Sequence, residues 1–75
     1  MRVFVTGAAG FISQHVVRML EERGDSVIAL LAPGESDRAL EGRSCTIRRC
    51  DIRDLPSVLA AMEGSDVVIH MAAIY

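Results

Sequence analysis

Two glycines, Gly7 and Gly10, directly follow a short apolar run, and a helical pattern begins immediately after them. A strand, a glycine turn and a helix in this order present backbone N–H groups and a helix N-terminus to an anion. The chemistry that this spacing favours is therefore phosphate binding. Gly7 must turn the chain sharply off the strand, and at Gly10 a side chain would keep a diphosphate away from the helix. The alternative is a tight connection that binds nothing.

The elements that position this turn alternate between strands and helices. Continuous apolar runs are typical of strands covered on both faces of a parallel sheet. On the first helix we expect an apolar face made of Ile12, Val16, Met19 and Leu20. The predicted strands are Arg2–Thr6, Ser26–Leu31, Ser44–Cys50 and Val67–Met71, and the predicted helices run from Phe11 to Gly24, over Ser36–Glu41, and from Asp54 to Gly64.

This order predicts an α/β fold, a doubly wound parallel sheet of which the first four strands (order 3-2-1-4) and three helices are present. The composition, 51% hydrophobic in 75 residues, is rich for so small an interior. The fourth strand would also form a bare apolar edge. We therefore expect residues 1–75 to be the N-terminal part of a domain truncated after strand 4, with the remainder of that domain as a partner.

Charge and cysteine content exclude several classes of protein. The 8 basic and 10 acidic residues are mixed along the chain, so we expect no nucleic-acid partner. No apolar run approaches the ~20 residues of a membrane span, and no signal peptide is evident, so we expect a cytoplasmic protein without a membrane partner. The spacing of Cys45 and Cys50 favours free thiols over a disulfide or a metal site.

Four motifs lie at the predicted carboxyl ends of the strands: Thr6–Ile12, the loop after Leu31, Asp51–Asp54, and His70-Met71-Ala72-Ala73. Together they resemble the extended short-chain dehydrogenase/reductases, the NAD-dependent epimerase/dehydratase family. The resemblance implies a Rossmann-type domain that binds NAD or NADP. It also implies a parent epimerase, dehydratase or reductase, with a homodimer as its expected assembly. Such an enzyme would transfer a hydride on a nucleotide-sugar or another hydroxyl or carbonyl substrate.

The same resemblance implies a role for particular residues. The glycine turn and the N–H groups at the start of the helix would hold the cofactor diphosphate. Asp51 would accept a hydrogen bond from the adenine amino group with Ile52 beside the ring, and small residues after strand 4 would let the backbone approach the ribose. We interpret His70 as a packed strand-end histidine. The implied cofactor-binding residues are Gly7, Ala9, Gly10, Phe11, Ile12, Asp51, Ile52, Ala72 and Ala73.

Some features depart from the family pattern. Ser13 replaces the third glycine. No acidic residue ends the second strand, as an NAD-preferring site would have, and Ala32 stands where many relatives with a similar Pro-Gly turn carry arginine. The choice between NAD and NADP therefore stays open, with Glu35, Ser36 and Arg38 within reach.

The family's catalytic Tyr-x-x-x-Lys pair is missing. The chain has no lysine, and Tyr75, its single tyrosine, cannot take that role, so we assign no catalytic residue. Two alternatives remain. One is a non-catalytic NAD(P)-binding sensor or regulatory protein. The weaker one is a methyltransferase-like domain, which would need the missing acidic residue after strand 2.

Overall fold

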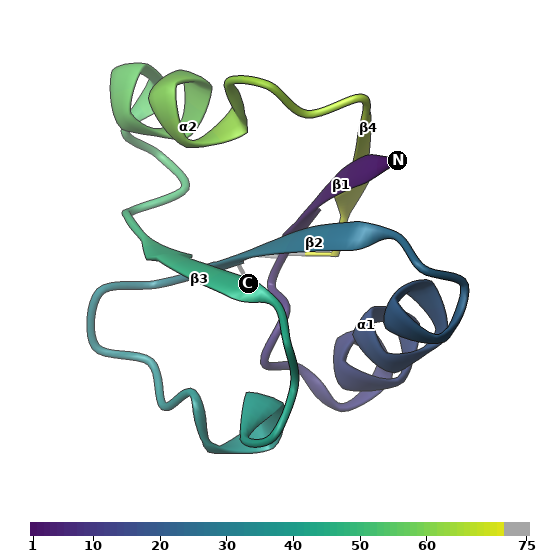
Figure 1. The fold of residues 1–75 in the computed structure, drawn as a ribbon. Coiled ribbons are helices and arrows are strands. Elements are labelled where there is room, and N and C mark those ends of the chain that lie inside the picture. Colours follow the sequence, from purple (N-terminus) through teal and green to yellow (C-terminus); the bar gives the residue numbers. More distant parts are fainter. Residues whose placement is uncertain (72–75) are drawn as a thin grey trace.

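The computed structural model of the chain describes residues 1–71 as a four-stranded parallel sheet with one α-helix on each face (Figure 1). The strands lie in the order β3-β2-β1-β4, which confirms the prediction. The elements are β1 (Arg2–Thr6), α1 (Phe11–Glu22), β2 (Ser26–Leu31), the 3-10 helix η1 (Arg38–Leu40), β3 (Thr46–Arg49), α2 (Leu55–Met62) and β4 (Val67–His70).

The two central strands, β1 and β2, are almost wholly apolar and bury both of their faces. Val5 pairs in parallel with Ala29 of β2 on one side and with Ile69 of β4 on the other. Because side chains alternate along a strand, Val3 and Val5 face α1 while Phe4 faces the other side, where it is fully buried. The polar strand β3 occupies an edge, as predicted.

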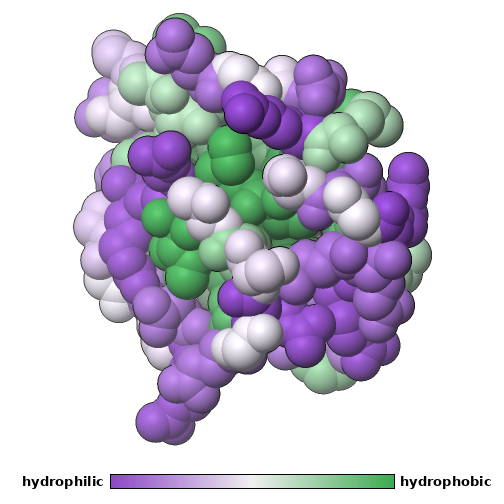
Figure 2. Space-filling model, viewed as in Figure 1, coloured by the Kyte–Doolittle hydropathy of each residue, from purple (hydrophilic) through white to green (hydrophobic). Residues whose placement is uncertain are grey.

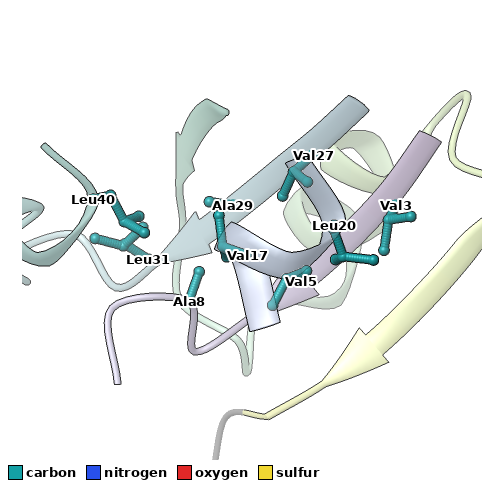
Figure 3. Close-up of a cluster of buried hydrophobic side chains, with 9 residues drawn as sticks. All are labelled: Val3, Val5, Ala8, Val17, Leu20, Val27, Ala29, Leu31 and Leu40. Carbon is teal, nitrogen blue, oxygen red and sulfur yellow. The ribbon is translucent and has the colours of Figure 1, made fainter. Parts of the chain in front are cut away.

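Helix α1 presents only part of the predicted apolar face to the sheet: Leu20 is buried and Val16 packs half-buried against the core, but Ile12 and Met19 do not take part. Ser13, Val17 and Leu20 are its buried residues, whereas Ile12 and Met19 are 65% and 59% exposed. The burial follows the i, i+4, i+7 spacing from Ser13, a small polar residue that hydropathy alone assigns to the solvent side. Figure 3 shows Val17 and Leu20 lying among the side chains of β1 and β2.

The predicted helix over Ser36–Glu41 is wrong, and the described residues contain two α-helices rather than three. Only the three-residue 3-10 helix η1 forms there, and it buries Leu40 beside Leu31 (Figure 3). The segment ends at Gly42, whose φ of 79° stops any helix, so too few residues remain to offset the free energy of nucleation.

The face of the sheet opposite α1 is only partly covered. Helix α2 lies over it (Figure 1) but buries Val58 alone, while Leu55 and Leu59 are exposed. At the edge strand β4, Val67 and Val68 are 38% and 44% exposed. Figure 2 shows hydrophobic residues gathered in a hollow between α2 and the sheet, with hydrophilic residues around it. The described residues therefore leave apolar surface open to a further covering layer.

Candidate functional site

The turn between β1 and α1 is built by its two glycines. Gly7 has a φ of 63°, a left-handed conformation that favours glycine, and its carbonyl accepts the N–H of Gly10 at 3.1 Å. A Cβ added to Gly10 would stand 3.3 Å from the Gly7 carbonyl oxygen, closer than most side chains tolerate. At these two glycines no side chain separates the backbone of the turn from a ligand.

Helix α1 begins here with unsatisfied donors. Gly10 is its N-cap, no side chain caps it, and its first turn carries no acidic residue. Within residues 1–71, the N–H groups of Phe11, Ile12 and Ser13 have no hydrogen-bond acceptor. These donors lie at the positive end of the helix dipole, so the first turn suits an anion such as a phosphate.

A cleft of about 780 Å³ opens beside this turn at the carboxyl ends of the strands. Its volume falls within the ~300–1,000 Å³ typical of small-molecule sites. The glycine turn and the segments that follow β2 and β3 contribute most of its lining. The lining residues are Gly7, Gly10, Leu30, Leu31, Ala32, Pro33, Gly34, Glu35, Cys50, Asp51, Ile52, Arg53 and Met71.

The structure brings four of the predicted cofactor-binding residues together in this cleft: Gly7, Gly10, Asp51 and Ile52. The other three in the glycine turn do not line it. Ala9 is half-buried, and Phe11 and Ile12 turn exposed side chains outwards while their N–H groups stay in the first turn of α1.

The two remaining predictions, Ala72 and Ala73, lie outside the described residues. We did not predict Cys50, Arg53 or Met71 as lining residues. For Arg53 the signal was present, because an arginine two residues after Asp51 can fold back onto its carboxylate.

Asp51 and Arg53 form a bidentate ion pair on the wall of the cleft. The Nε and backbone N–H of Arg53 donate to Oδ1 at 3.0 and 2.9 Å, and Nη2 donates to Oδ2 at 2.7 Å. The Arg53 side chain, followed by its backbone N–H, lowers the pKa of Asp51 to about 2. The carboxylate therefore stays ionised and oriented, and it keeps lone pairs for a donor from a ligand.

The segment after β2 forms a closed turn. The N–H of Ala32 donates to Oε1 of Glu35 at 3.0 Å, and the N–H of Glu35 donates to the carbonyl of Ala32 at 3.1 Å. From β3, Nη1 of Arg49 donates to the Glu35 carbonyl at 2.6 Å. The pattern of a Pro-Gly pair indicated a turn, but the return of the Glu35 side chain to Ala32 had no signal in the sequence.

The hydroxyl of Thr6 joins the ends of β1 and β4. Thr6 is buried, and its Oγ1 lies 2.8 Å from Nδ1 of His70 and accepts the N–H of Met71 at 3.0 Å. His70 is exposed rather than packed, which corrects our prediction of its surroundings. Its hydrogen bond to Thr6 is a structural contact that fixes β4 beside the strand leading into the glycine turn.

Other kinds of site find little support among residues 1–71. Cys45 and Cys50 are free and half-buried, as predicted, and burial raises the pKa of both thiols, which disfavours the reactive thiolate. In this part of the chain, no group of His, Cys, Asp or Glu is arranged to hold a metal ion. None of its helices combines the length and the apolar character needed to cross a membrane.

Residues 3–75 match the sequence model described as the NAD dependent epimerase/dehydratase family. Among curated proteins, the chain is 32% identical over 71 residues to a decarboxylating sterol-4-alpha-carboxylate 3-dehydrogenase from Dictyostelium discoideum. The match covers 95% of this chain and 22% of that protein. The chain thus spans about a quarter of the length of the curated relatives it matches, as with an uncharacterised Schizosaccharomyces pombe protein of which it covers 25%.

Solved structures give the same picture. A UDP-glucose-4-epimerase from Stenotrophomonas maltophila, with bound NAD and formylated UDP-arabinopyranose, superposes with a TM-score of 0.87 at 33% identity, over 100% of this chain and 25% of that one. The Bordetella bronchiseptica enzyme WbmH, in complex with NAD⁺, superposes with a TM-score of 0.82 at 31% identity, over 99% and 26%.

Proposed function

Because this chain belongs to the NAD dependent epimerase/dehydratase family, we propose that residues 1–75 form the N-terminal part of an NAD(P)-binding Rossmann domain and hold the adenosine diphosphate half of the dinucleotide. The observation that carries the proposal is the tight glycine turn, which leads into a helix start with free N–H groups and lines the same cleft as Asp51. The pyrophosphate of a dinucleotide binds at such a helix start.

In this proposal each part of the cleft binds one part of the cofactor. The diphosphate rests at Gly7 and Gly10 on the N–H groups of the first turn of α1. Asp51, held by Arg53, accepts a hydrogen bond from the adenine amino group, and Ile52 packs beside the ring. The remaining assignments, Ala9 at the diphosphate and Ala72 and Ala73 at the ribose, rest on the family resemblance.

The reaction belongs to the complete protein that carries this chain. We propose an epimerase, dehydratase or reductase that moves a hydride between NAD(P) and a nucleotide-sugar or another hydroxyl or carbonyl substrate. Relatives named as an epimerase and as a dehydrogenase support that range. The alternative is an NAD(P)-binding sensor or regulatory protein of the same fold that binds the dinucleotide without turnover. A Tyr-x-x-x-Lys motif later in the complete protein, together with measured turnover by that protein, would favour the enzyme over the sensor.

Two further parts of the proposal concern the setting of the protein. A cytoplasmic location agrees with the two free, half-buried cysteines, because thiols persist in reducing compartments. A homodimeric parent rests on the family resemblance and is tested by light scattering of the complete protein.

Substitution of Gly10 tests the site. We expect Gly10→Ala in the complete protein to weaken NAD⁺ and NADP⁺ binding by about tenfold or more in calorimetric titrations, because the methyl group crowds the Gly7 carbonyl and the phosphate position.

The matched control is Gly24→Ala at the far end of α1. Gly24 has a φ of 88° and open space around it, so this variant should lose about 1 kcal/mol of stability but keep its affinity. Unchanged dinucleotide affinity in Gly10→Ala would show that the phosphate does not rest at this turn.

A further inference from the structure

Glu35 returns its carboxylate to the end of β2, although it lies four residues beyond the last residue of that strand, Leu31. The two reciprocal hydrogen bonds between Glu35 and Ala32 close the Ala32–Glu35 turn on itself. Glu35 therefore lines the cleft next to Ala32, the first residue after the strand, whose own side chain is only a methyl group. The turn thus supplies, from a later position, the acidic group that the end of the strand lacks.

Arg49 clamps this turn from the neighbouring strand. Its Nη1 donates to the carbonyls of Glu35 at 2.6 Å and Ala32 at 3.3 Å, and its Nη2 pairs with Asp37 at 3.3 Å. Arg49 is the register partner of Leu31, so its guanidinium starts beside the strand end that it holds. These contacts fix the backbone on both sides of the Pro-Gly pair and hence the place of the Glu35 carboxylate.

We propose that this clamped turn makes Glu35 the acceptor for the hydroxyls of the adenosine ribose, so that the complete protein prefers NAD to NADP; this inference rests on the proposed function. An ionised carboxylate only accepts hydrogen bonds, and a ribose 2′-hydroxyl can donate one. Within residues 1–71, Oε2 of Glu35 has no hydrogen-bond partner, which leaves it open to a ligand. The 2′-phosphate of NADP would instead bring about 1.5 to 2 negative charges against it.

The charges on the cleft wall favour the same cofactor. Glu35 and Asp51 are anionic, and Arg53, the one cation among the described lining residues, is already paired with Asp51. The guanidinium of Arg49 is occupied by the turn, and Arg38 does not line the cleft. A 2′-phosphate would therefore find no unengaged cation in the described part of the wall.

The test compares the affinities of the complete protein for NAD⁺ and NADP⁺ by calorimetric titration. We expect the unmodified protein to bind NAD⁺ at least about tenfold more tightly than NADP⁺. Glu35→Gln should weaken NAD⁺ binding by about tenfold and leave NADP⁺ binding unchanged or stronger, because it removes both an acceptor and a charge. Glu41→Gln is the matched control, since it removes the same charge from an exposed residue that does not line the cleft.

Arg49→Met separates positioning from charge. If Arg49 positions Glu35, its loss weakens NAD⁺ binding several-fold, whereas if it acted only as a cation its loss would weaken NADP⁺ more than NAD⁺. Arg48→Met, at the preceding residue of β3, is the control, because successive side chains of a strand point to opposite faces.

Each outcome bears on a different claim. Equal or tighter binding of NADP⁺ by the unmodified protein, or an unchanged preference in Glu35→Gln, would overturn this inference and leave the proposed function standing. Binding of neither dinucleotide would overturn both. Selective loss of NADP⁺ affinity in Arg49→Met would overturn the clamp.

Discussion

At the scale of single residues, Asp51 depends on its neighbour Arg53 for its charge and its orientation. The ion pair holds the pKa of this carboxyl at about 2, below its ordinary value of 3.8. Because the folded pKa is the lower one, the pair stabilises the folded chain above about pH 4 and the contribution disappears as the pH falls towards 2. Both groups are exposed to solvent, so we expect this contribution to matter for the ligand more than for the fold.

Removal of Arg53 should shift this titration. We expect Arg53→Gln to move the midpoint of the Asp51 carboxyl, followed by NMR as the pH is lowered, from about 2 towards 3.8. Dinucleotide affinity should then begin to fall at a higher pH than in the unmodified protein. The control is Arg48→Gln, which also removes one positive charge but from β3, and it should leave the midpoint of Asp51 unchanged. Equal shifts in both variants would contradict the ion pair between Asp51 and Arg53.

At the scale of elements, the rotation of α1 about its axis decides which residues stabilise the fold. Two neighbouring residues of the helix have opposite surroundings, since Leu20 is 7% exposed and Met19 is 59% exposed. Hydropathy could not distinguish them, because the buried stripe begins with a serine. The strands were predictable, and β1 and β2 have their predicted bounds. The reason is that a short, continuous apolar run is typical of a strand that a parallel sheet buries on both faces.

The rotation of α1 gives a test that does not involve a ligand. We expect Leu20→Ala to lower the free energy of unfolding by about 2–4 kcal/mol, because it opens a cavity against β1 and β2. Met19→Ala should change it by less than about 0.5 kcal/mol. Urea denaturation of the two variants measures the difference, and a larger loss for Met19→Ala would show that the helix faces the sheet as its hydropathy suggests.

At the scale of the whole molecule, topology was easier to predict than the shape of the site. The order of strands and helices fixed where the strand ends meet, and so placed Gly7, Gly10, Asp51 and Ile52 in one cleft. The position of Glu35 depends instead on a guanidinium from β3, 14 residues further along the chain. A contact of this kind, between a strand and a distant turn, follows from tertiary packing, so it cannot be predicted from a local pattern of residues.

The open apolar surface beside α2 and β4 predicts how the 75-residue chain behaves alone. A chain of this size buries only about 60% of the surface that its unfolded form exposes, so its stability is marginal. We expect a broad thermal transition by circular dichroism, binding of a hydrophobic dye, aggregation on concentration and very weak binding of NADH. A sharp, cooperative transition of a soluble monomer would contradict this expectation.

Ser13 has a consequence that reaches beyond its own contacts. Only 3% of it is exposed, and its Oγ would lie 3.6 Å from a Cβ on Gly10, so it is a spacer between α1 and the strands beneath. A larger side chain at this position would push the beginning of α1 away from the strands, and the unpaired N–H groups of its first turn would move with it. The distance between the anion-binding N–H groups and the sheet is thus set by Ser13, a residue whose side chain does not contact the anion.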